Sequence, residues 1–96
     1  MATYILLSTL TESGAELIKK HPGRIRDANR DMEALGVEIV AQYAVLGSYD
    51  FVTIVEAPDN RTIVRVSTEL SLRGNLKITT LPALPIEEFI AELRQG

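Results

Sequence analysis

The sequence lacks cysteine and tryptophan and contains a single histidine, His21. Without cysteine it can form neither a disulfide framework nor a thiolate metal site. One histidine cannot supply the cluster of imidazoles that a histidine-based metal site needs within one subunit. We therefore expect neither a bound metal nor any other cofactor.

The sequence also lacks an excess of positive charge and any long apolar run. Its net charge of −3 and pI of about 5.1 argue against nucleic-acid binding, which requires a clustered basic surface. No apolar run approaches the ~20 residues that a membrane helix needs, and the Met1-Ala2-Thr3 start has no basic signal-peptide region. We expect a cytoplasmic protein that binds neither nucleic acid nor membrane.

The chain of 96 residues has the length of one domain, and we treat residues 1–96 as such. Hydrophobic residues make up 46% of the sequence and charged residues 24%, which is ordinary for a globular protein.

The rest of the chain is organised around residues 46–58, which read as a strand end, a turn and a complete strand. Gly47-Ser48 between two apolar runs predicts a two-residue hairpin turn, because glycine adopts a positive φ without strain. This turn pairs Ala44 with Phe51 and Ala41 with Ile54. The nearly apolar face is expected to lie under the helices. It comprises Ile39, Ala41, Tyr43, Val45, Val52 and Ile54.

The remaining elements follow from periodicity and capping residues. Strands are predicted over residues 2–9, 37–46, 50–57 and 75–81. Thr11 and Asp59 are expected N-caps, and Gly36 is expected to end the first helical region. His21-Pro22-Gly23 should divide that region in two, because proline disrupts a helix interior. A short helix follows Pro85.

This βαββαβ order predicts an α+β, ferredoxin-like fold with an antiparallel four-stranded sheet, helices on one face and an added C-terminal helix. The other sheet face would then be uncovered and apolar, which favours a homodimer or higher homo-oligomer through that face. We assign five residues to this open face: Val40, Gln42, Phe51, Thr53 and Val55.

Several segments together resemble the GYD-domain family. They are Met1-Ala2-Thr3-Tyr4-Ile5, Pro22-Gly23-Arg24, Leu35-Gly36, Gly47-Ser48-Tyr49-Asp50 with the following 55–59 segment, and Gly74-Asn75. The resemblance runs nearly from end to end and implies a dimeric α+β barrel made of two ferredoxin-like sheets. It implies no reaction. The family belongs to the dimeric α+β-barrel superfamily, which includes cofactor-free monooxygenases, isomerases, haem-handling proteins and ligand-binding regulators, and the fold does not choose among them.

Three residues are candidates for chemistry. Tyr49 could act as a proton donor and Asp50 as a base, but Asp50 could equally accept backbone hydrogen bonds near a turn. His21 could serve as a general base, or could lie exposed in a loop. Tyr43 and Arg24 complete the predicted ligand-binding set, in which Arg24 would face an anion.

Three functions remain open. The first is a small-molecule-binding oligomer with a pocket between sheet and helices, around Tyr43, Tyr49, Asp50 and His21. The second is a cofactor-independent isomerase or monooxygenase that uses Tyr49, Asp50 or His21 for proton transfer. The third is a structural or regulatory oligomerisation module. A pocket with converging polar groups would favour the first two.

Overall fold

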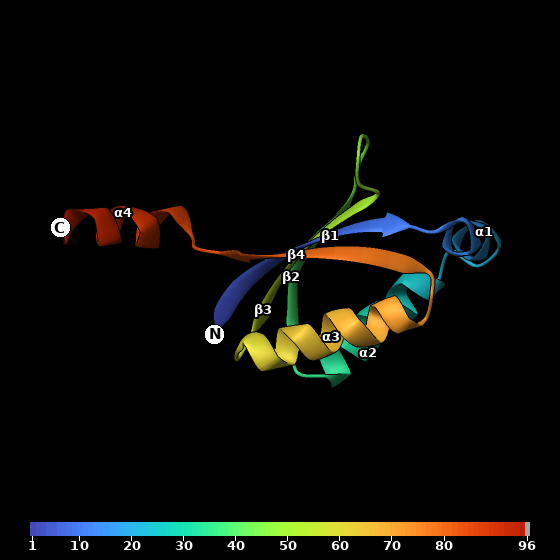
Figure 1. The fold of residues 1–96 in the computed structure, drawn as a ribbon, viewed down its shortest axis with the longest axis horizontal. Helices are drawn as coiled ribbons and strands as arrows, with labels where there is room; N and C mark the ends of the chain where they lie inside the picture. Colours follow the sequence, from blue (N-terminus) through green and yellow to red (C-terminus); the bar gives the residue numbers. More distant parts are fainter. Residues whose placement is uncertain (96) are drawn as a thin grey trace.

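Eight elements follow one another along the chain. A computed structural model describes residues 1–95. Its elements are β1 (Ala2–Leu10), α1 (Glu12–Lys20), α2 (Arg24–Ala34), β2 (Glu38–Ala44), β3 (Phe51–Ala57), α3 (Asn60–Leu72), β4 (Leu76–Ala83) and α4 (Ile86–Arg94) (Figure 1). None of these helices has the length and apolar character needed to cross a membrane.

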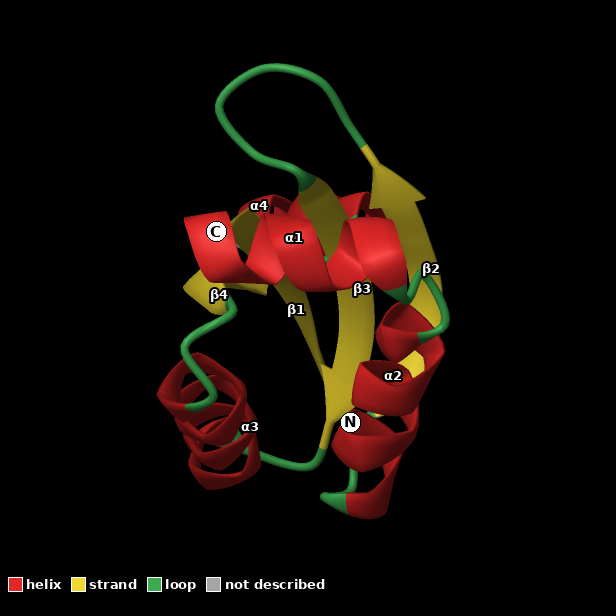
Figure 2. Ribbon diagram, turned by 90° about the vertical axis from the view of Figure 1, so that its right-hand side faces the viewer, coloured by secondary structure: helices red, strands yellow, loops and turns green. Residues whose placement is uncertain are grey.

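The four strands form one antiparallel sheet in the order β2-β3-β1-β4. Helices α2 and α3 pack against one face of it, and α1 lies over the end where β1 finishes (Figures 1 and 2). The predicted α+β, ferredoxin-like fold is confirmed.

Local signals place most helix ends where the sequence predicts them. The Thr11 hydroxyl accepts a hydrogen bond from the Gly14 amide, and the Asp59 carboxylate accepts one from the Thr62 amide. Both side chains thus satisfy amides that a helix start leaves free. The chain leaves the helical path between α1 and α2, at His21-Pro22-Gly23, as expected from the proline.

The connection between β2 and β3 is longer than the predicted two-residue turn. The pairing of Ala41 with Ile54 and of Ala44 with Phe51 is confirmed, and Gly47 has the expected positive φ of 102°. However, residues 45–50 lie outside both strands. The reason is that Asp50 bonds to β1: its amide donates to the Ser8 carbonyl at 2.8 Å.

The assignment of the two sheet faces was wrong. Of the five residues predicted for the open face, Gln42, Phe51, Thr53 and Val55 lie on the helix side, where Val55 is fully buried. A bulge between Ile39 and Ala41 places Ile39 opposite Val55, and leaves Val40 exposed as the extra residue. The pattern favoured the more apolar face for the helices, but the face with Gln42 and Thr53 is the covered one, where these polar groups bond to each other and Gln42 to Asn29.

The core lies between the helix-facing side of the sheet and the helices. Its buried hydrophobic residues come from β1, β3, α2, α3 and the segment before β2. They are Tyr4, Leu6, Met32, Val37, Val55, Ala57, Ile63, Val66 and Leu70. The predicted buried stripe of α3 (Ile63, Val66 and Leu70) is therefore confirmed.

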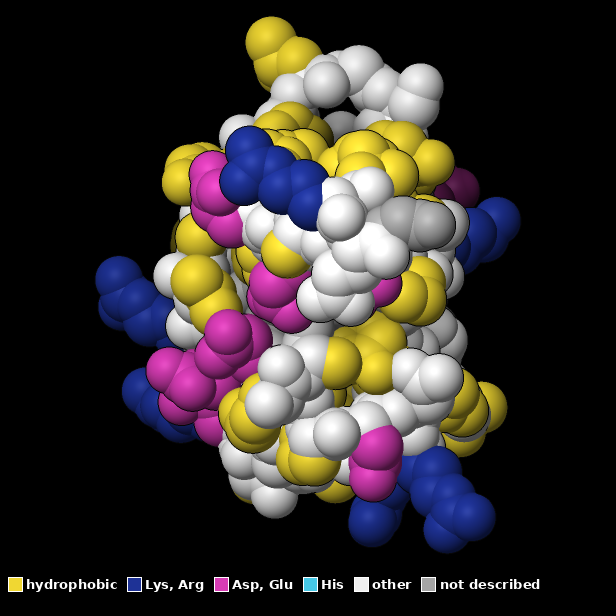
Figure 3. All heavy atoms as spheres, turned by 90° about the vertical axis from the view of Figure 1, so that its left-hand side faces the viewer, with side chains coloured by type: hydrophobic (Ala, Val, Ile, Leu, Met, Phe, Trp, Pro, Cys, Tyr) yellow, Lys and Arg dark blue, Asp and Glu magenta, His cyan; other side chains and the backbone are white. Residues whose placement is uncertain are grey.

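Helix α4 extends away from this core as an arm (Figure 1). None of its residues is buried, and the longest dimension of the molecule is 52 Å. The radius of gyration is 14.6 Å, against about 12.5 Å for a compact chain of this length. Hydrophobic side chains remain at the surface at this end (Figure 3), among them Leu84, Ile86, Phe89 and Leu93.

Candidate functional site

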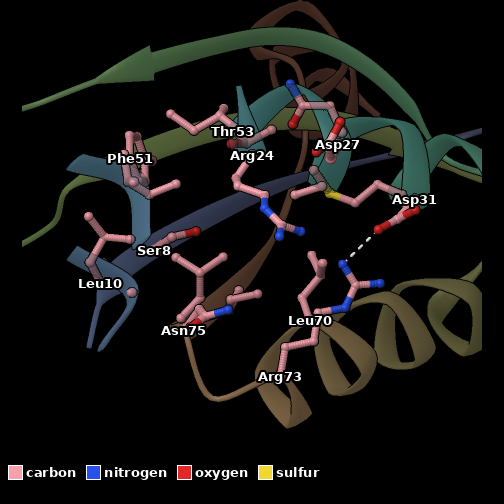
Figure 4. Close-up of a pocket in the computed structure, with 18 of the residues that line it drawn as sticks. Ser8, Leu10, Arg24, Asp27, Asp31, Phe51, Thr53, Leu70, Arg73 and Asn75 are labelled. Atoms are coloured by element: carbon pink, nitrogen blue, oxygen red, sulfur yellow. Dashed lines mark hydrogen bonds and ion pairs between the residues drawn. The ribbon is translucent and has the colours of Figure 1, made fainter. Parts of the chain in front are cut away.

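A cavity of about 160 Å³ lies between the helix-facing side of the sheet and helices α1, α2 and α3 (Figure 4). The strands β1, β3 and β4 form most of its floor. Helices α1 and α2 lie over it, and the end of α3 with Asn75 closes one side. The position of α1 depends on Gly14, which allows this helix to approach the backbone of Asn75 closely.

Most of the wall is hydrophobic. Its apolar side chains are Leu6, Leu10, Leu17, Ile18, Ile25, Ala28, Met32, Phe51, Leu70, Leu76 and Ile78. A mainly apolar wall with a few placed polar groups is typical of a binding site for a small organic molecule.

Three polar side chains in the wall form a hydrogen-bonded network that joins α2 to the sheet. The Asn29 amide nitrogen donates to the Gln42 side-chain oxygen at 2.7 Å, and the Gln42 nitrogen donates back at 3.0 Å. The same Gln42 nitrogen lies 3.1 Å from the Thr53 hydroxyl oxygen, to which it also donates. These hydrogen bonds offset the cost of burying amide groups, so the network holds α2 over the sheet.

Charged side chains gather at the edge of the cavity. The Arg73 guanidinium donates to the Asp31 carboxylate at 2.7 Å and so links α3 to α2, as Figure 4 shows. Arg24 is the first residue of α2 and is exposed overall; its guanidinium extends over the cavity, between Ser8 on one side and Leu70 on the other (Figure 4).

The structure separates the residues that the sequence predicted to surround one pocket. Arg24 lines the cavity. Tyr43 lies on the opposite face of the sheet and is 59% exposed. His21 is exposed and borders a shallow depression near the start of α2. Tyr49 lies half-buried in the connection between β2 and β3, outside the cavity wall.

Asp50 is held by backbone contacts. Its carboxylate accepts a hydrogen bond from the Leu10 amide at 2.8 Å, and its own amide bonds to β1 as described above. This corresponds to the second of the two sequence-based interpretations, in which Asp50 binds backbone near a turn. Since Leu10 and Phe51 both line the cavity, Asp50 fixes part of the cavity wall. Roles in ligand binding or catalysis for Tyr43, Tyr49, Asp50 and His21 stay predictions.

Sequence reasoning missed Ser8 and Asn29, and it placed Gln42 and Thr53 in the wrong interface. A signal for Ser8 exists in the sequence, because Ser8 continues the alternate positions of Tyr4 and Leu6, which are buried. A polar residue in such a series is a candidate for lining a cavity.

The pKa of Asp59 lies below its ordinary value, chiefly because the Thr62 backbone amide and then the Thr62 hydroxyl donate hydrogen bonds to its carboxylate. Asp59 caps α3 and does not line the cavity, so this shift concerns stability. Within residues 1–95, no group of three or more His, Cys, Asp or Glu side chains is placed to hold a metal ion.

Fold and site together define a small ferredoxin-like α+β protein with a largely apolar cavity between sheet and helices. The sequence profile of the GYD domain matches residues 4–93. The chain therefore belongs to the GYD-domain family, as its sequence segments predicted.

The chain is also similar to a named bacterial protein and to two solved structures. It is 50% identical over 95 residues to a Thermus thermophilus protein named glutamine synthetase and cystathionine beta-lyase binding protein, covering 98% of this chain and 100% of that protein. Two crystal structures share the fold. FFRP-DM1 has a TM-score of 0.58 at 21% identity, covering 88% of this chain and 100% of that one. TTHA0845, also from Thermus thermophilus, has a TM-score of 0.57 at 25% identity, covering 88% and 95%.

Proposed function

We propose that this protein is a small-molecule-binding regulatory protein that works as a homo-oligomer. The observation that carries the proposal is the cavity of about 160 Å³ between sheet and helices, which combines a mainly apolar surface with polar and charged side chains. A cavity near 150 Å³ with an apolar wall is large enough to hold a benzene-sized molecule. The wall is built from three helices as well as the sheet, so a bound ligand would act on the packing of several elements at once.

Native mass spectrometry of the protein purified gently from its own host tests this proposal. We expect a reproducible extra mass per subunit. Ala28→Phe should abolish the extra mass, because Ala28 is half-buried in the cavity wall and a phenyl ring there would fill the space. Ala34→Phe is the matched control on the exposed end of α2 and should keep the extra mass. Absence of any adduct from the unmodified protein would refute the proposal.

The sheet face opposite α2 and α3, which no helix covers within residues 1–95, supports the proposed homo-oligomer. Its apolar side chains come from all four strands and remain partly or largely exposed: Ile5, Leu7, Ala41, Tyr43, Val52, Ile54 and Leu81. An apolar surface spanning a whole sheet is larger than a monomer usually exposes, and a second copy of the same face would cover it. The α4 arm has an unburied apolar side that could pack against the same second copy.

Sedimentation velocity tests the interface. Val52→Asp places a charge on the open face, on an inner strand between Leu7 and Tyr43, and should shift the protein to monomers, because an unpaired charge in an apolar contact is strongly unfavourable. Val64→Asp is the control, since Val64 is 61% exposed on α3, away from that face. A Val52→Asp variant that sediments like the unmodified oligomer would rule out this interface.

A second candidate function is the binding of enzymes. It is favoured by the relative that is 50% identical over nearly the whole chain and is named for binding glutamine synthetase and cystathionine beta-lyase. Under this proposal the protein binds the corresponding enzymes of its own host. Co-sedimentation of the purified protein with each enzyme tests it, with an unrelated metabolic enzyme of similar size as control. Failure to co-sediment with either enzyme would remove this candidate.

A further inference from the structure

Four charged side chains line the cavity: Arg24, Asp27, Asp31 and Arg73. The Asp31 carboxylate binds the Arg73 guanidinium at 2.7 Å, and the Asp27 carboxylate lies 3.4 Å from the guanidinium of Arg30, which lies outside the cavity wall. Arg24 also lines the cavity, and among residues 1–95 it forms no ion pair. Within residues 1–95, Arg24 is therefore the guanidinium of the cavity wall that is free to pair with a ligand.

The Ser8 hydroxyl is the second group available to a ligand. Ser8 is only 6% exposed, and the side-chain hydrogen bonds of residues 1–95 include none from its hydroxyl. The described chain seals no unpaired side-chain polar atom inside the protein, so the hydroxyl keeps access to the cavity space. It faces the Arg24 guanidinium across that space (Figure 4). A largely buried hydroxyl gains from a partner, which an acceptor atom of a ligand would supply.

These two groups are suited to an anion with a single negative charge. A guanidinium binds a carboxylate through two parallel hydrogen bonds, and a hydroxyl can donate a third. Because the two arginines and two aspartates of the wall sum to zero charge, a phosphate monoester with two negative charges would leave more uncompensated negative charge there than a carboxylate. Asp27 and Asp31 are also already engaged by arginines, so an ammonium group on the ligand would find no free carboxylate in the wall.

The remainder of the wall determines the size and polarity of the rest of the ligand. Beyond Arg24 and Ser8 the cavity is bounded mainly by leucine, isoleucine, methionine and phenylalanine side chains. Since a cavity near 150 Å³ holds a benzene-sized group, the observed 160 Å³ fits an apolar body of that size with a carboxylate attached.

We propose that the cavity binds a small monocarboxylate with an apolar body, with its carboxylate at Arg24 and Ser8 and its body against the apolar wall. This inference rests on the proposed function, in which the cavity is a ligand site, and adds the chemical class of the ligand. The ligand class is a carboxylic acid of roughly ten non-hydrogen atoms without an amino group.

The test is to titrate the full chain with each of two probes and to monitor binding through the changes in its amide NMR shifts. The probes are benzoate and its neutral isostere benzamide, which have the same size and shape and differ in charge. We expect benzoate to shift the amides of cavity residues such as Ser8 and Leu10. We expect benzamide to bind about tenfold more weakly or worse, because it lacks the charge-assisted hydrogen bonds.

Variants distinguish the effect of the Arg24 charge on binding from an effect on folding. Arg24→Gln should weaken benzoate binding about tenfold or more and leave benzamide binding unchanged. Arg26→Gln is the matched control, because Arg26 is exposed two residues further along α2 and does not line the cavity. Ser8→Ala should weaken benzoate binding without lowering the melting temperature, since it removes a hydroxyl without a protein partner. Thr9→Ala, on the other face of the same strand, should leave binding unchanged.

Three outcomes would overturn the proposal. Equal binding of benzoate and benzamide would show that the cavity selects shape and not charge. Benzoate binding that survives Arg24→Gln, or that shifts amides away from the cavity, would place the anion elsewhere. No binding of benzoate at millimolar concentration would also reject the carboxylate. In each case a neutral adduct in native mass spectrometry, lost in Ala28→Phe, would leave the proposed function standing.

Discussion

Replacing Gly14 with alanine should increase the helix propensity of α1 but create a steric clash. We expect the clash to have the larger effect, so that the variant is less stable. Alanine is favoured over glycine by at most about 1 kcal/mol in a helix, and Gly14 is the third residue of α1, so sequence reasoning alone predicts a somewhat more stable protein. In the structure, a Cβ at this position would lie 2.1 Å from the Asn75 carbonyl oxygen, whereas ordinary contacts begin at 3.4 Å. The carbonyl belongs to the backbone, so it cannot turn away as a flexible side chain could.

The close approach at Gly14 is fixed by hydrogen bonds from the residue before α1. The Thr11 amide donates to the Asn75 carbonyl at 3.1 Å, and the Thr11 hydroxyl donates to the Gly74 carbonyl at 2.7 Å. Relief of the clash would require α1 and this loop to separate, which would weaken both bonds. Overpacking of this kind costs about 1–3 kcal/mol. Because the clash is with backbone, we expect a cost at the upper end of that range, about 3 kcal/mol. Subtracting a propensity gain of about 1 kcal/mol leaves a net loss of about 2 kcal/mol in the free energy of unfolding.

Thermal unfolding at fixed protein concentration measures the effect, because association would otherwise change the midpoint. A net loss of about 2 kcal/mol corresponds to a decrease of about 8–16 °C in the melting temperature for a domain of this size. Gly23→Ala is the matched control: a Cβ there meets no atom within 4 Å, and φ is −64°. It should be neutral or raise stability by up to about 1 kcal/mol. A Gly14→Ala variant as stable as Gly23→Ala would refute the reasoning.

Three further predictions concern the ends and connections of the strands and helices. Asp50→Ala should lower the free energy of unfolding by about 1–3 kcal/mol in urea, because the Leu10 amide loses its acceptor; an unchanged midpoint would show that water replaces the carboxylate. Gly47→Val should cost about 1–3 kcal/mol through strain at a φ of 102°, with no steric clash, and a chevron plot that superimposes on that of the unmodified protein would contradict it. The lowered pKa of Asp59 makes its contribution to stability present above the unfolded value near 3.8 and lost as pH falls through the folded value. Asp59→Asn caps without titrating, so the melting temperature of the unmodified protein should fall relative to this variant as pH drops below about 4; parallel curves would exclude the linkage.

The candidate site was only partly predictable. Arg24 was a candidate for anion binding on sequence grounds, and the structure places it at the cavity. Ser8, which faces Arg24, lies 16 positions earlier on a different element. No local pattern links two such residues, so their meeting depends on how α2 crosses the sheet. The prediction for Tyr43 assumed that its face of the strand lies under the helices, whereas that face is the open one.

The sequence by itself determined the elements, their order, the pairing of β2 with β3, and the caps at Thr11 and Asp59. These features depend on backbone conformations and on side-chain contacts with close neighbours in the chain. The tertiary structure decided which sheet face the helices cover, because Gln42 and Thr53 find hydrogen-bond partners on the covered face and a bulge at Val40 shifts the alternation by one residue. It also decided that α4 leaves the core and that Arg24 and Ser8 share one cavity. These outcomes depend on packing between distant segments, which no local pattern encodes.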